Sequence, residues 1–131
     1  MRIWLGLTVA AALGIAVPAI AHHSYAMFDP QTTVVVEGTV SEFEFINPHG
    51  WLHILATDAD GNTARWSIEL GGINAMTRSG WEADTVKPGD AIAIEINPMK
   101  DGSRGGHYLK ATLPDGRTLG GGDTGLPPVA R

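Results

Sequence analysis

A series of short β-type segments, separated by turn-forming residues, constrains the fold of this chain more than any other feature. Residues 33–40, 51–57, 63–70, 91–97 and 107–113 are rich in β-branched and aromatic residues. One short helix is predicted between the third and fourth segments, over residues 73–79. Three strands, a helix and two strands is the order of elements in an OB-fold barrel. We therefore expect an all-β chain with one short helix, folded as a small five-stranded OB-fold-like barrel; a small sandwich with a stray helix is the competing architecture.

Single residues refine this expectation. Gly38 is placed for a bulge or a sharp coil in the first strand, which extends towards Phe45. In the helix, Ile73, Met76 and Thr77 follow the i, i+3, i+4 spacing, so they share a face that could close the end of a barrel.

The composition narrows the classes of function. A length of 131 residues supports one domain. The chain has no cysteine, which excludes disulfides, thiolate catalysis, iron–sulfur clusters and Cys-based zinc sites. Its formal net charge of −5 makes nucleic acid a poor partner, because binding to phosphates needs basic surface. The sequence contains no nucleophile-elbow, P-loop or dinucleotide-binding motif, so nothing in it demands an enzyme.

Residues 1–21 have the layout of a cleaved signal peptide. Arg2 precedes an uncharged apolar run over residues 3–16, Pro18 breaks the helix, and Ala19 and Ala21 supply the small residues of a cleavage site. A membrane anchor is the alternative, but the apolar run is short for a span. We therefore expect a periplasmic protein that has no membrane span after processing and begins at His22.

The rest of the chain divides into three parts. Residues 22–32 form an N-terminal arm that ends in a turn signal at Asp29-Pro30, and the domain as a whole covers residues 22–119. Residues 120–131 are rich in Gly and Pro and are expected to be a flexible tail.

The new N-terminus suggests a copper site. His22 would offer both its α-amine and its imidazole, and His49, in the turn Asn47-Pro48-His49, could supply a third nitrogen. Such a T-shaped arrangement is a histidine brace, and three nitrogens in one plane suit Cu(II). Met27 could add a thioether for Cu(I), and Asp29 could accept a hydrogen bond from a ligand. His23 competes with His22, since it could chelate through the amine and the intervening amide.

Other residues have simpler interpretations. His53 and His107 are expected to be surface strand residues rather than ligands. A paired-histidine start could also be only a polar beginning that binds copper weakly. Three tryptophans could form a stacking platform for sugars or bases, but packing residues are the preferred interpretation: Trp51, Trp66 and Trp81. Glu42 and Glu44 could be a carboxylate dyad, and a solvated strand face explains them at least as well.

These motifs together resemble a family of short exported bacterial proteins of unknown function. The matching stretches are His22-His23-Ser24-Tyr25-Ala26-Met27-Phe28-Asp29, Glu37-Gly38-Thr39-Val40, Asn47-Pro48-His49, Trp66-Ser67-Ile68-Glu69, Arg78-Ser79-Gly80-Trp81 and Val86-Lys87-Pro88-Gly89-Asp90. The resemblance covers residues 22–119 and implies a periplasmic location and a small β-barrel, without a settled activity. Its motif histidines correspond to His22, His23 and His49.

Three functions follow as hypotheses. The first is a periplasmic copper-binding protein for storage, delivery or buffering, with metal ligands His22, His23, His49 and Met27 and a periplasmic or membrane copper protein as partner. The alternative is a metal-free OB-fold binding module that recognises a small ligand or an envelope partner through the face around Trp51 and Trp66. A copper oxidase or oxygenase is the third and is disfavoured, because so small a barrel offers little surface to a substrate.

Overall fold

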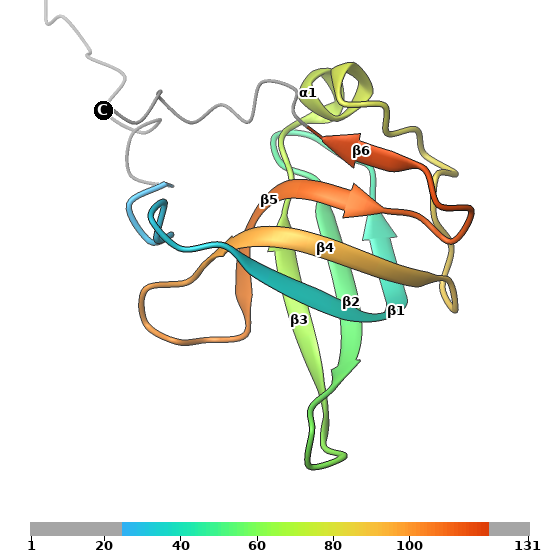
Figure 1. Ribbon diagram of the computed structural model, residues 1–131. Helices are drawn as coiled ribbons and strands as arrows, with labels where there is room; N and C mark the ends of the chain where they lie inside the picture. Colours follow the sequence, from blue (N-terminus) through green and yellow to red (C-terminus); the bar gives the residue numbers. More distant parts are fainter. Residues whose placement is uncertain (1–24, 121–131) are drawn as a thin grey trace, which may run out of the picture.

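The β-strands of this protein wrap into a closed barrel with one short helix at its end (Figure 1). The computed structural model describes residues 25–120. The elements in chain order are β1 (Val34–Glu44), β2 (Trp51–Thr57), β3 (Thr63–Glu69), α1 (Ile73–Arg78), β4 (Ala91–Pro98), β5 (Gly105–Thr112) and β6 (Thr118–Gly120). Within this range no helix is long and apolar enough to cross a membrane.

Strand pairing closes the barrel. β1 pairs with β2 and β4, β2 with β3, and β4 with β5, all antiparallel. A short parallel pairing of β3 with β5 then joins the two edges and completes a ring of five strands. The prediction of a five-stranded OB-fold-like barrel is confirmed.

One strand was not expected from the sequence. β6 pairs antiparallel with the end of β5, and its Leu119 is buried. Gly120, predicted to begin the tail, is therefore the last residue of a strand. A strand of three residues is too short to show a period of two, so its sequence pattern does not identify it.

β1 belongs to both halves of the barrel because it bends. Its first half pairs with β4 and its second half with β2, and the register shifts between Val40 and Glu42. The irregularity therefore lies just after the position predicted at Gly38. Gly38 has a different role, since a Cβ there would lie 2.2 Å from the carbonyl oxygen of Leu55 on β2. This glycine lets two backbones approach closely.

The core fills the barrel and extends to α1. The fully buried side chains include Leu52, Ile54, Ile68, Ile94 and Ile96. They come from β2, β3 and β4, as the alternation of apolar residues predicts.

The helix covers one end of this core. Met76 of α1 and Trp81 beyond it are almost completely inaccessible, so Trp81 is a packing residue as predicted. Ile73 is half-buried and packs against the core, whereas Thr77 is exposed, so the predicted helix face is right at two of its three positions. α1 lies at the opposite end of the molecule from the β2–β3 hairpin (Figure 1).

The described part of the arm, residues 25–32, is fastened to the end of β4. Phe28 is buried and forms an isolated bridge with Met99. The amide of Asp29 donates to the Pro98 carbonyl at 2.9 Å, and the Lys100 amide donates to the Met27 carbonyl at 2.9 Å. This docking fixes where the chain enters the barrel.

Candidate functional site

A row of polar residues lies under the arm, where the parallel pairing of β3 with β5 closes the barrel. We call this line of closure the seam. Glu69, Asn97 and His107 are the buried polar side chains of the described range. They are neighbours in the sheet, because His107 of β5 is the register partner of both Asn97 on β4 and Glu69 on β3. Buried polar groups are costly unless they are paired. Three of them in one row therefore mark this seam as the chemically distinctive part of the barrel.

His49 joins this row from the turn between β1 and β2. Its Nδ1 contacts Oε1 of Glu69, and the two side chains are 35% and 7% exposed. His49 leans onto the barrel, where the buried carboxylate of Glu69 holds its ring. When the imidazole is neutral, this contact places the proton on Nδ1 and leaves the lone pair on Nε2.

The turn that carries His49 is itself held tightly. Asn47 Oδ1 accepts a hydrogen bond from the Ile73 amide at 2.9 Å, which joins the turn to the start of α1. The Gly50 amide donates to Gly71 at 3.0 Å. A Cβ on Gly50 would lie 2.5 Å from the sulfur of Met76. His49 is therefore presented from a well-packed scaffold.

The ring of His107 supports the arm. It lies 5.3 Å from the ring of Tyr25 in an edge-to-face arrangement and 5.5 Å from the ring of Phe28. His107 is only 2% exposed, so the prediction that it is a surface strand residue is wrong. His107 is buried because β5 pairs with β3 and because the arm packs on its ring. Both contacts join segments that are distant in the sequence, so the sequence of β5 alone does not indicate them.

His49, His107 and Tyr25 share one cavity of about 150 Å³. The remaining lining comes from α1, its flanking residues and β5: Gly71, Gly72, Ala75, Met76, Arg78, Ser79 and Tyr108. Burial raises the pKa of the Tyr108 hydroxyl. The cavity thus combines two imidazoles with the first described residue of the arm.

Of the other predicted ligands, the structure describes Met27 alone. His22 and His23 lie outside the described residues, as do the predicted signal peptide and residues 121–131 of the predicted tail. Met27 is 44% exposed and lines a neighbouring cavity of about 170 Å³, together with Met99, Trp51 and Glu69. Glu69 therefore borders the Met27 cavity while its carboxylate contacts His49.

The Asp29 carboxylate stabilises the turn in the arm and was predicted to accept a hydrogen bond from a metal ligand. Its carboxylate accepts hydrogen bonds from the Thr32 hydroxyl at 2.6 Å and from the Gln31 amide at 3.0 Å. These two bonds lower the pKa of Asp29. Among residues 25–120, no group of three or more His, Cys, Asp or Glu side chains is arranged to hold a metal ion.

His53 and the glutamates of β1 behave as ordinary strand residues. The His53 ring stacks on Trp51 and contacts the Ser67 hydroxyl at 3.0 Å. Burial lowers the pKa of His53, and the nearby charge of Arg65 lowers it further. Glu42 forms an exposed ion pair with Arg65 at 2.8 Å, as expected of a solvated strand face.

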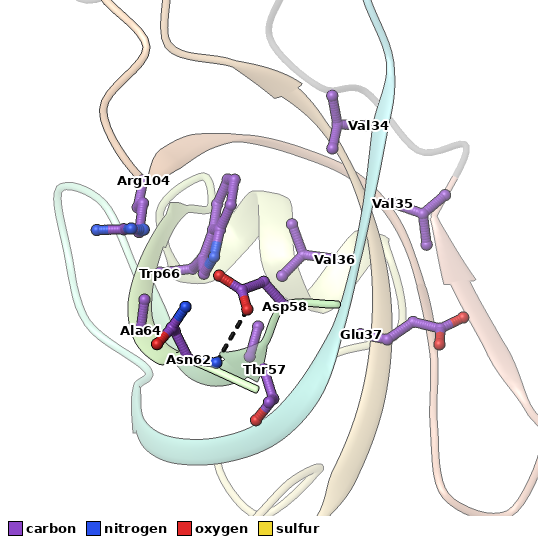
Figure 2. Close-up of a pocket in the computed structure, with 11 residues that line it drawn as sticks. Val34, Val35, Val36, Glu37, Thr57, Asp58, Asn62, Ala64, Trp66 and Arg104 are labelled. Carbon is purple, nitrogen blue, oxygen red and sulfur yellow. Dashed lines mark hydrogen bonds between the residues drawn. The ribbon is translucent and has the colours of Figure 1, made fainter. Parts of the chain in front are cut away.

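A larger cavity is lined by the first half of β1, the β2–β3 hairpin and Arg104. Its volume is about 380 Å³, and Figure 2 shows Trp66 standing along one wall with Arg104 beside it. The backbone amide of Asn62 donates to Asp58 at 2.9 Å at the rim. Trp66 is only partly buried, so it is available to a ligand in a way that Trp81 is not.

Sequence reasoning missed Glu69 as a residue of this site. The sequence does contain an indication of its role: Glu69 is an acidic residue at the end of a predicted strand, between the apolar residues Ile68 and Leu70. All three prove to be buried. A charged residue in such a place usually has a partner, and here the partner is His49.

Comparison with known proteins gives a family and no activity. A search of curated proteins and a search of solved structures each found no match. A model described as a family of unknown function (DUF6152) matches residues 10–109, most of the chain and nearly all of the barrel. The chain therefore belongs to this family of unknown function.

Proposed function

We propose that the processed protein binds a copper ion between the N-terminal His22 and His49, and that it stores, delivers or buffers copper in the periplasm. The observation that carries this proposal is the contact between His49 and the buried carboxylate of Glu69. Histidines that bind metals usually donate the other ring N–H to a carboxylate or a carbonyl, which fixes the ring and strengthens it as a ligand. The His49–Glu69 pair has this form, with Nε2 as the ligand atom.

The position of the arm supports the second half of the proposal. Tyr25 lines the cavity that His49 lines, and it packs on His107. His22 is three residues before Tyr25, and three residues span at most about 10 Å. In a chain that begins at His22, covalent geometry therefore limits the α-amine to about 10 Å from Tyr25, a residue of the cavity that His49 also lines.

The donor set favours copper. An amine and two imidazoles provide three nitrogens, and divalent copper has the highest affinity of the first-row ions for such ligands. The carboxylate of Glu69 supplies negative charge close to the ion. Copper binding should weaken as pH falls, since the α-amine and imidazole of His22 have reference pKa values of about 7.7–8.0 and 6.5 and must lose their protons to bind.

The decisive test is a Cu(II) titration followed by EPR. The protein is exported and processed, its N-terminus is confirmed as His22 by mass spectrometry, and a version with one additional N-terminal Ala is the matched control. We expect binding of one copper per chain with a signal from several nitrogens, lost in the extended version. Equal affinity in both versions would refute the brace.

A second candidate function rests on the larger cavity. Trp66 and the valines of β1 form a partly apolar hollow, and its charged lining residues are Arg104, Asp58 and Glu37 (Figure 2). Such a hollow suits a small ligand with an apolar body and polar groups. In that case Trp66→Ala abolishes ligand binding while His49→Ala does not. Screening both variants against a panel of small metabolites by thermal shift distinguishes this binding module from the copper protein.

A further inference from the structure

We propose that the edge of β1 between Val34 and Glu37 binds an extended segment of a partner polypeptide, which pairs antiparallel with β1 as an additional strand. The segment occupies the cavity of about 380 Å³ beside Trp66, so the proposal assigns this cavity a peptide in place of a small ligand. It is independent of the proposed copper site, because this cavity shares no lining residue with the cavity that contains His49.

The first observation is that, within residues 25–120, this half of β1 is paired on one side only. β1 pairs with β4 from Val34 to Thr39, but its register with β2 begins only at Thr39, which is opposite Leu55. From Leu55 to its end, β2 continues to pair with β3. Residues of both diverging strands line the cavity, which therefore lies along the open edge of β1. Lys and Pro usually protect such an edge, and residues 33–36 contain neither.

The second observation concerns the direction of the main-chain groups. The Val40 amide donates to the Asp90 carbonyl at 2.8 Å, and the Val40 carbonyl accepts from the Gly89 amide at 2.8 Å, so the groups of Val40 face the β4 side. Successive residues of a strand direct these groups to opposite edges. The amides and carbonyls of Val35 and Glu37 therefore face the cavity side, where β2 offers no register partner. Strand addition by a peptide uses an edge of this kind.

The third observation is the alternation of side chains along this edge. Val34 and Val36 lie on the same side of β1 as Trp66, whereas Val35 and Glu37 lie on the other side (Figure 2). Side chains of directly paired residues share one face of a sheet. An added strand therefore directs alternate residues into the cavity, against Val36 and Trp66, and places the intervening residues beside Val35 and Glu37.

These neighbours define the chemistry of the segment. Its inward residues are apolar, because Val36 is buried and Trp66 stands along one wall of the cavity. A β-branched outward residue suits Val35, whose side chain is 56% exposed, and a basic residue suits the exposed carboxylate of Glu37. Read antiparallel to β1, this is the sequence Lys-Val-Thr-Val, with Lys opposite Glu37.

A free segment suits this edge better than a second copy of the barrel or a small molecule. In a second copy, Val34 and Val36 pack in the core of that copy, so they are not available to enter this cavity. A small molecule lacks the repeating N–H and C=O groups that pair with an open strand edge. The charge also suits a basic peptide: Asp58 and Arg104 have opposite signs, so Glu37 leaves the cavity with one net negative charge.

The test uses the processed protein labelled with ¹⁵N, and its probe is a capped peptide with the core Lys-Val-Thr-Val. In the free protein, the amides of Val35 and Glu37 should exchange with deuterium faster than those of Val34 and Val36, which face β4. When the peptide is added, the NMR signals of the Val35 and Glu37 amides should shift and their exchange should slow. Equal protection of all four amides in the free protein, or no change at Val35 and Glu37 with the peptide, would overturn the proposal.

Two methylated peptides test the main-chain bonds without altering the protein. Methyl groups on the Lys and Thr amides, which face β1, should weaken binding at least about 10-fold more than methyl groups on the two Val amides, which face away. Equal binding of the two peptides would overturn strand addition, because side chains alone would then hold the ligand, as in the small-ligand alternative.

Charge reversal at Glu37 tests the assigned register. Glu37→Lys should weaken binding of the peptide about 5-fold, and a peptide with Glu in place of Lys should restore it. Glu82→Lys makes the same change at an exposed residue beyond α1 and should bind like the wild type. An unchanged preference for the Lys peptide in Glu37→Lys would contradict the proposal. A concentration-dependent dimer in analytical ultracentrifugation, with the Val35 and Glu37 amides protected in it, would also overturn it in favour of a second copy.

Discussion

Replacing Glu69 tests the central argument about the site, because this carboxylate is proposed to act only through His49. Glu69→Gln keeps the size of the side chain and one oxygen that can accept from Nδ1, but removes the charge. Glu69→Ala removes the partner altogether. The contact is shielded from water on the side of Glu69, which is 7% exposed, whereas His49 is 35% exposed, so solvent weakens the contact in part.

The expected magnitudes follow from this environment. A hydrogen bond to a charged group contributes roughly 1.5–3 kcal/mol, against roughly 0.5–1.5 kcal/mol for a neutral one. Loss of the charge should therefore cost about 1–1.5 kcal/mol, which is about 5- to 10-fold in the dissociation constant for copper. Loss of the whole orienting group should cost about 10- to 100-fold. We expect the affinity order wild type, then Glu69→Gln, then Glu69→Ala.

The assay is a chelator competition for Cu(II) on processed proteins, with thermal unfolding of the metal-free proteins alongside. Glu42→Gln is the matched control, since it makes the same chemical change at an exposed carboxylate that pairs with Arg65. The control should bind copper with nearly unchanged affinity. If Glu69→Gln binds as tightly as Glu42→Gln while both remain folded, the carboxylate does not orient a ligand, and the reasoning from the His49–Glu69 contact is refuted.

Three other predictions concern the surroundings of the site. Phe28→Ala should lower the free energy of unfolding by roughly 3 kcal/mol, because this buried ring packs on His107. It should also weaken copper binding, because the arm is released from the barrel. Chemical denaturation measures the first effect and the copper titration the second. Met27→Leu should leave the Cu(II) signal unchanged, because Met27 lines the neighbouring cavity; a reduced nitrogen-coordinated EPR signal would contradict this. The pKa of His53 is lowered in the folded state, so the unfolded state takes up the proton at a higher pH, and stability should fall as pH drops below 6.5. His53→Gln should make the melting temperature less dependent on pH in this range. Equal dependence of the melting temperature on pH in the variant and the wild type would contradict this prediction.

The barrel was predictable because its signals are local. Alternating apolar residues identify a strand such as β4, and Ile92, Ile94 and Ile96 are buried as their spacing indicates. The position of the helix between the third and fourth strands then selects the barrel. β6 was not predicted, because a strand of three residues is too short to show an alternation of apolar and polar residues.

The site was only partly predictable, because it depends on contacts between distant segments. His49 could be singled out from its turn, but its partner Glu69 lies 20 residues further along the chain. His107 was misjudged because nothing in β5 itself indicates that the arm will cover it. Whether a histidine on a strand is exposed or buried depends on what packs against that strand, and here the covering residues are Tyr25 and Phe28.

The location of the site follows from the way the barrel closes. The parallel β3–β5 pairing that completes the ring involves only three residue pairs, and Glu69 and His107 form the last of them. Beyond this pair the two strands no longer pair, so the seam ends there and the arm and the turn that carries His49 lie against it. The polar residues at this seam are therefore held by the strands of the barrel on one side and contacted by the arm on the other. If the processed protein binds copper as proposed, the ion joins the N-terminus to His49 on the barrel, and metal binding should raise the stability of the docked arm more than that of the barrel core.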